Sequence, residues 1–131
     1  MATYKKVRGE LKARFAPEDK SCPSIDMEVA LANCMDSEEF FREMVAEYLK
    51  GDKTAELEKI FAAENWNEYK ILVHALKSTS QVIGAVGLSE KARAQEFAAR
   101  DGNIDFLKKN HADLMATYKK VREELSRWAG D

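Results

Sequence analysis

From residue 24 onward the chain contains no proline, and its apolar residues return at intervals of three and four. Both prolines of the 131-residue chain, Pro17 and Pro23, lie in one short polar stretch. Apolar residues at this spacing form one face of an α-helix, whereas a half-buried strand requires strict alternation, which no segment shows convincingly. The sequence therefore predicts an all-α fold, most simply an antiparallel bundle of helices joined by short connections.

Start and stop signals divide the chain into helices. We expect helices at residues 2–15, 25–35, 38–50, 52–65, 65–86, 88–102 and 103–129. Polar N-caps and glycine stops mark several of these boundaries. The signals are Asp36 or Ser37 as an N-cap, Gly51 as a stop, Gly87 as the end of the long helix, Ser89 as the next N-cap and Gly102 as a further stop.

Composition excludes several functional classes. Acidic and basic residues are interspersed and give a net charge of -2, so no basic block indicates nucleic-acid binding. No apolar run approaches the roughly 20 residues of a membrane span, and the N-terminal stretch has no apolar signal-peptide core. Cys22 and Cys34 do not have the spacing of a metal-ligand pair and fit reduced thiols. We expect a cytoplasmic protein, or the cytoplasmic part of a larger one.

One segment of the chain occurs twice. MATYKKVRGEL at residues 1–11 returns as MATYKKVREEL at residues 115–125, with only Gly9 against Glu123 changed. The repeat divides the chain into an extra N-terminal helix with its linker, residues 1–24, and a main domain, residues 25–131. The simplest origin of the copy is a preceding tandem repeat, and a natural duplication or a cloning artefact would give the same pattern. We expect that the extra helix packs elsewhere on its own bundle, or that residues 1–15 pair with a neighbouring chain as a dimer or helix swap.

His74, one of only two histidines, lies in the middle of the predicted long helix. Successive helical residues turn by about 100°, so with Tyr69 at zero His74 falls at about 140°, on the side opposite the apolar arc. The apolar arc consists of Trp66, Tyr69, Val73, Leu76, Ser80 and Ile83, extended on one side by Leu72 and Thr79.

The helix face around His74 carries positive charge and small side chains. Its members are Asn67, Lys70, Lys77, Ser78, Gln81 and Ala85, flanked by Ile71 and Val82. None of them is a carboxylate, so an anion would be attracted there. Small residues leave room for another surface, and a neutral imidazole on a rigid helix is a nucleophile available near neutral pH.

The stretch HALKSTSQVIGAVGL, residues 74–88, resembles the signature of histidine-containing phosphotransfer (HPt) domains. The matching residues are His74, Leu76, Lys77, Ser78, Ser80, Gly84, Ala85 and Leu88. Residues 25–49 resemble the opening of such domains, and LMATYKKVREEL resembles their closing helix, so the resemblance covers about residues 25–128. It implies a four-helix bundle with additional short helices.

The resemblance also implies a function in two-component phosphorelays. His74 would accept a phosphoryl group from the aspartate of a receiver domain and pass it to another receiver. Lys77 would offset the phosphoryl charge, and Gln81 would help orient the histidine. The partners would be response-regulator receivers or a hybrid sensor kinase, and the receiver would supply Mg²⁺. This domain would need no metal or cofactor of its own and would have no autokinase activity, because no ATP-binding glycine-rich loop is present.

The expected docking surface surrounds His74. It consists of Lys70, Ile71, Ser78, Val82 and Ala85, next to the helix of Phe40 and Phe41. Serine at position 78 replaces the glycine frequent in the family and still leaves room for a receiver. Glu96 and Phe97 stand where the family often has leucine and glutamate, and we expect this departure to affect packing more than chemistry.

Two alternatives stand beside the relay. A helical module that binds receivers without phosphotransfer would have the same fold, but its core would not require His74, Lys77 and Gln81. A metal-binding bundle needs inward-facing Glu-x-x-His pairs, and neither histidine has a glutamate three residues before it. We expect His111, which lacks the Leu-Lys-Ser context, to be a surface histidine.

Overall fold

A computed structural model describes residues 24–129, and this part of the chain contains helices and no strands. The helices are α2 (Met27–Asn33), α3 (Glu38–Lys50), α4 (Thr54–Ala62), α5 (Trp66–Val82), α6 (Val86–Asp101) and α7 (Ile104–Trp128). None of the described helices is both long and apolar enough to cross a membrane. The predicted helix at 2–15, its linker and any dimer contact through residues 1–15 lie outside the described residues.

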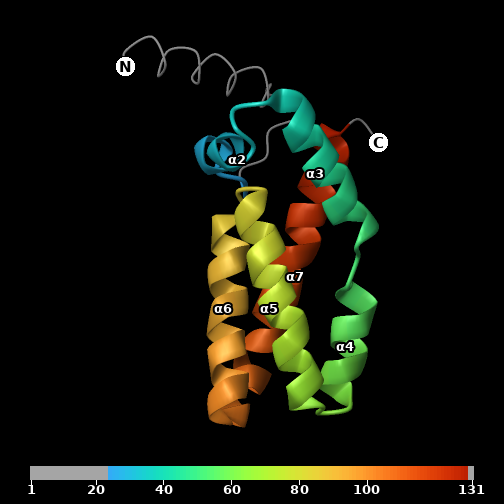
Figure 1. The fold of residues 1–131 in the computed structure, drawn as a ribbon. Coiled ribbons are helices and arrows are strands. Elements are labelled where there is room, and N and C mark those ends of the chain that lie inside the picture. The colour runs from blue at the N-terminus through green and yellow to red at the C-terminus, as the bar shows by residue number, and fades with distance from the viewer. Residues whose placement is uncertain (1–23, 130–131) are drawn as a thin grey trace.

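The long helices α5, α6 and α7 form the body of the molecule (Figure 1). Helix α6 packs against both α5 and α7, and α4 contacts α5 and α7. Helices α3 and α4 follow one another along one side of this body, and α2 lies across one end. The all-α prediction is confirmed.

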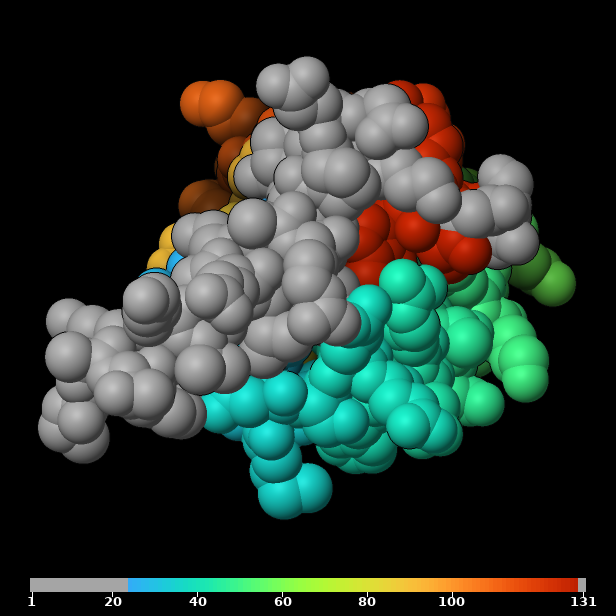
Figure 2. Space-filling view, turned by 90° about the horizontal axis from the view of Figure 1, so that it is seen from above, coloured from blue at the N-terminus to red at the C-terminus, as the bar shows by residue number. Residues whose placement is uncertain are grey.

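Each long helix directs its apolar stripe toward a shared core. The largest fully buried side chains are Tyr69, Tyr118, Phe41, Leu31, Leu57, Ile83, Leu88, Leu107, Leu114, Leu125 and Gln95. Burial of one apolar side chain of this set contributes roughly 1.5–3 kcal/mol to the free energy of unfolding, so the apolar stripes hold the helices together. At the end that carries α2, the last turns of α7 lie against α3, where the Phe41 and Trp128 ring centroids are 5.2 Å apart (Figure 2).

Several predicted helix boundaries are confirmed. Ser37 caps α3, because its Oγ accepts a hydrogen bond from the Phe40 N–H at 3.1 Å. Gly51 ends α3, and Gly102 ends α6 with a left-handed φ of 72°. Helix α4 is shorter than the predicted 52–65, ending at Ala62 before Glu64, whose φ is 55°.

The predicted end of the long helix is wrong. Helix α5 ends at Val82 rather than Val86, and the chain reverses through Gly84, whose φ is 85°. Gly87 lies inside α6 instead of ending a helix. Ser89 is not an N-cap either, since it is buried in α6 and its hydroxyl donates to the Lys77 carbonyl at 2.9 Å. The turn forms at Gly84 because the start of α2 packs directly against its backbone.

Candidate functional site

His74 stands on the exposed side of α5, as the helical wheel predicts. Its side chain is 58% exposed. The opposite face of the helix holds the buried residues Tyr69, Val73, Leu76 and Ser80. The imidazole is therefore presented to solvent from the middle of a helix that the core holds in place.

Helix α6 adds a carboxylate to this site. Glu96 Oε2 lies 2.7 Å from His74 Nδ1, and Glu96 Oε1 lies 2.8 Å from Lys77 Nζ. Glu96, which we expected to affect packing more than chemistry, therefore contacts both His74 and Lys77. The hydrogen bond from Ser89 to the Lys77 carbonyl fixes the register of the two helices, and two turns further along α6 this register brings Glu96 beside His74.

The charge of Glu96 determines which ring nitrogen of His74 is available. Partial burial favours the neutral carboxyl, but the contacts with Lys77 and His74 outweigh it and hold the pKa of Glu96 below its ordinary value. The group is therefore a carboxylate at neutral pH, and a carboxylate only accepts hydrogen bonds. Nδ1 must donate its proton to Glu96, which leaves the lone pair of a neutral ring on Nε2. Within residues 24–129 no hydrogen bond engages Nε2.

Gln81 is separated from His74 by two helical turns. Seven residues of an α-helix rise by about 10 Å, and in the described part of the chain no hydrogen bond joins the Gln81 side chain to His74. Its backbone carbonyl instead accepts from Asn33 Nδ2 at 3.1 Å, which ties α2 to the end of α5. The group that orients the ring in this structure is Glu96.

Four of the five predicted docking residues reach the surface near His74. Ile71 is 59% exposed, Ser78 is exposed, and Lys70 and Val82 are half-buried. Ala85 is fully buried, so its prediction as a surface residue is corrected. Helix α5 ends at Val82, three residues before Ala85. The turn that follows carries Ala85 inward to the start of α6 rather than along the exposed face.

A groove runs between α3 and α5 beside this surface. Its volume is about 250 Å³, and it is lined by Met44, Glu47, Tyr48, Ser78, Thr79, Val82 and Ile83. Phe40 of α3 is partly exposed, whereas Phe41 is buried against Trp128 and cannot contact a partner. The groove begins at Ser78, one helical turn from His74, and its apolar residues Val82 and Ile83 lie about one turn further along α5.

His111 is buried, so the prediction of a surface histidine is wrong. Its ring stacks on Phe61 with centroids 3.7 Å apart, and its Nε2 lies 2.6 Å from Glu58 Oε1. Its Nδ1 lies 2.9 Å from Tyr69 Oη, which accepts a hydrogen bond from Gln95 Nε2 at 2.9 Å. Because the Tyr69 hydroxyl accepts from Gln95, its own proton is free to go to Nδ1. This network joins α4, α5, α6 and α7 and has a structural role.

Comparison of the chain with protein-family models, with curated proteins and with solved structures found no match in any of the three. Residues 24–129 also contain no group of three or more His, Cys, Asp and Glu side chains that could hold a metal ion.

Proposed function

We propose that this chain is a phosphorelay module of the HPt type, in which His74 carries the phosphoryl group between receiver domains. The observation that carries the proposal is the exposed His74 ring, whose Nδ1 is held by Glu96 while no hydrogen bond within the described residues engages Nε2. The helix arrangement supports it, because α3 and α4 together form one column beside α5, α6 and α7, as a four-helix bundle would require (Figure 1).

The proposed transfer uses the Nε2 lone pair. Nε2 attacks the phosphorus of a receiver aspartyl phosphate, a P–N bond forms, the P–O bond to the aspartate breaks, and the aspartate leaves as a carboxylate. The ring keeps its Nδ1 proton and gains positive charge, which the Glu96 carboxylate stabilises at 2.7 Å. Phosphoryl transfer depends mainly on position and charge, so the receiver's Mg²⁺ and acidic pocket would complete the site.

The surface around His74 suits docking of a receiver. The apolar groove between α3 and α5 would accept an apolar face of the receiver, and Ile71 would extend this contact on the other side of the ring. Receivers in cytoplasmic response regulators or in a hybrid sensor kinase are the proposed partners.

The experiment that tests this function is phosphoryl transfer from a panel of phosphorylated receivers, and from acetyl phosphate, to the full chain. Intact mass and chemical stability would be measured on the product. We expect a gain of one phosphoryl group that is labile in acid and stable in base. A folded protein that binds a receiver but gains no phosphoryl group from it would favour the alternative, an interaction module that uses the same groove without transfer.

Lys77→Ala should slow transfer by about 10- to 100-fold, because it removes a positive charge beside the developing phosphoryl charge. Binding of the receiver should change little. Single-turnover transfer rates and receiver affinity would be measured together, with Lys109→Ala on the exposed face of α7 as the matched loss of a lysine. An unchanged rate in Lys77→Ala would exclude this lysine from the mechanism.

Glu96→Gln should slow transfer about tenfold, because a charged hydrogen bond to the ring is replaced by a neutral one worth roughly 1.4 kcal/mol less. The fold should be retained. Ring ¹⁵N chemical shifts of His74 would report the loss of preference for the Nδ1–H tautomer, which a purely structural role would not affect. Glu90→Gln, on an exposed position of the same helix, is the control. Equal rates and equal tautomer populations in the two variants would contradict a positioning role for Glu96.

A further inference from the structure

The repeated segment copies the inward face of α7. Within residues 115–125 the buried positions are Met115, Tyr118, Val121, Glu124 and Leu125. The corresponding residues of the N-terminal copy are identical in type: Met1, Tyr4, Val7, Glu10 and Leu11. The single difference, Gly9 against Glu123, falls at an exposed position of α7. Every side chain that seats residues 115–125 in the core is therefore encoded a second time.

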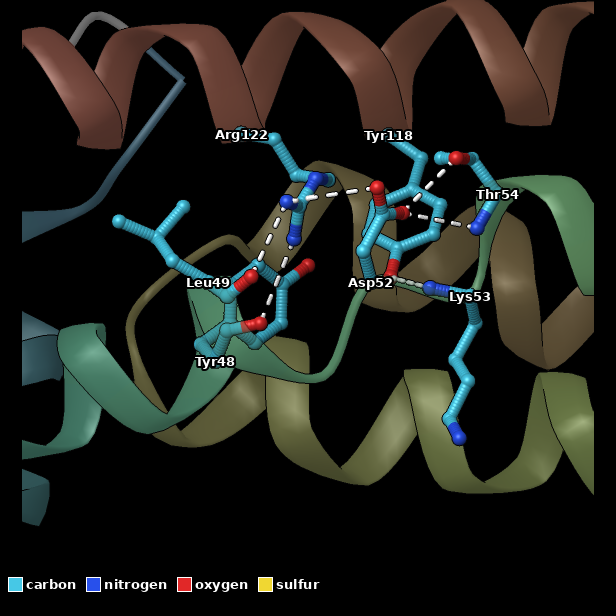
Figure 3. Close-up of polar contacts among 7 residues, drawn as sticks. All are labelled: Tyr48, Leu49, Asp52, Lys53, Thr54, Tyr118 and Arg122. Carbon is cyan, nitrogen blue, oxygen red and sulfur yellow. Dashed lines mark hydrogen bonds and ion pairs between the residues drawn. The ribbon is translucent and has the colours of Figure 1, made fainter.

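The copy also repeats, in sequence, the residues through which this part of α7 makes its polar contacts, which Figure 3 shows for Tyr118 and Arg122. The Tyr118 hydroxyl accepts from the Lys53 N–H at 3.1 Å. The Arg122 guanidinium donates to the Leu49 carbonyl at 3.0 Å and lies 3.5 Å from Asp52 Oδ2. These bonds satisfy backbone groups where α3 ends and α4 begins, and Tyr4 and Arg8 carry the same donors and acceptors at the same spacing.

The chain connection allows the copy to reach the same place. Ser24 donates through its N–H to Glu124 Oε1 and through its hydroxyl to Glu124 Oε2, each at 3.0 Å. Residue 24 therefore lies beside the C-terminal end of the 115–125 segment. Twelve residues, 12–23, connect residue 11 to Ser24 and can span up to about 40 Å, far more than this short separation requires.

We infer that residues 1–11 are a reserve closing segment, able to take the place of residues 115–125 in their own chain. In the intact protein residues 115–125, the resident segment, occupy this place in the bundle because they continue from residues 104–114 in one helix. The resident segment is also anchored by Trp128, which packs against Phe41 and lies under the Arg42 guanidinium at 4.6 Å. The copy has Arg14 at the position that corresponds to Trp128, so it lacks this anchor.

The exchange would leave the His74 site intact. Helices α5 and α6 supply His74, Lys77 and Glu96, and residues 115–125 supply none of the contacts to these side chains. The bundle could therefore be closed by either segment with the same exposed imidazole. This inference depends on the repeat and the packing of α7, and not on the proposed phosphotransfer.

A double-mutant cycle in the full chain tests the inference. Val121→Asp places a charge at a fully buried position of the resident segment, and Val7→Asp makes the same change in the copy. Val7→Asp alone should shift the melting temperature by less than about 1 °C. In the Val121→Asp background Val7→Asp should lower the melting temperature by at least about 5 °C, because residues 1–11 then close the bundle in place of residues 115–125. Lys5→Gln, which corresponds to the exposed Lys119, should have no effect in either background.

An equal effect of Val7→Asp in both backgrounds would overturn the inference. If Val121→Asp does not fold at all, the milder pair Leu125→Ala and Leu11→Ala gives the same double-mutant cycle. Additive effects of these two substitutions on the melting temperature would also overturn the inference. Sedimentation of Val121→Asp should give the mass of one chain at all concentrations. A mass of two chains would overturn the assignment to the same chain and indicate exchange with a second copy.

Discussion

Replacing His74 by glutamine should abolish phosphoryl acceptance and leave the protein folded. Glutamine has no nucleophilic nitrogen, so transfer from any receiver should fall below detection, a loss of at least about 100-fold. The side chain is 58% exposed, and its hydrogen bond with Glu96 lies near the surface, where such contacts contribute little to stability. The melting temperature should therefore change by no more than about 2 °C. Intact mass after incubation with phosphorylated receivers and a thermal melt by circular dichroism would be recorded on the same sample.

His111→Gln is the control that separates chemistry from packing. This variant loses the stack on Phe61 and the hydrogen bonds to Tyr69 and Glu58, so its melting temperature should fall by several degrees. It should still accept one phosphoryl group, because His74 remains exposed. A result in which His111→Gln loses acceptance and His74→Gln retains it would contradict the assignment of the acceptor.

The side of α5 that faces solvent could be predicted because it follows from local geometry. A turn of about 100° per residue places His74 opposite Tyr69 whatever the rest of the chain does, and the burial of Tyr69 agrees. The caps at Ser37 and Gly102 could be predicted for the same reason, since each involves only neighbouring residues.

The partners of the two histidines could not be predicted, because they come from other helices. Glu96 is 22 residues from His74 in sequence, and Glu58 is 53 residues from His111. A helical wheel gives the contents of one helix face but not the register of the helix packed beside it. Gln95 and Glu96 are adjacent in sequence and point about 100° apart from α6, so they contact the two different histidine sites: Gln95 bonds Tyr69, and Glu96 bonds His74.

The break between α5 and α6 differs from its predicted place for a similar reason. Gly84 and Gly87 both lie near the end of an apolar run, and the apolar spacing that predicted Gly87 does not exclude Gly84. Long-range packing selects Gly84, because the Asp26 N–H donates to its carbonyl at 2.7 Å and α2 is held against it. Gly84 thus has a structural explanation in this fold.

Gly84→Ala should destabilise the protein strongly, although it adds only one methyl group. A Cβ at this position would lie 2.5 Å from the Asp26 carbonyl oxygen and 2.9 Å from the Ala30 Cβ, and the φ of 85° is unfavourable for alanine. Strain of roughly 1–3 kcal/mol from the dihedral and a similar amount from the overlap give about 2–6 kcal/mol. This is a large part of the 5–15 kcal/mol typical of a domain, so the midpoint of chemical denaturation should fall steeply.

Gly87→Ala is the matched control, because a Cβ there meets no atom within 4 Å and the residue lies in the first turn of α6. Alanine favours a helix over glycine by up to about 1 kcal/mol, so this variant should be as stable as the wild type or slightly more so. Urea denaturation followed by circular dichroism would compare the two. If Gly84→Ala and Gly87→Ala unfold at the same urea concentration, α2 does not pack against the Gly84 backbone in solution. The turn would then lack the contact that ends α5 before Ala85 and directs that residue into the core.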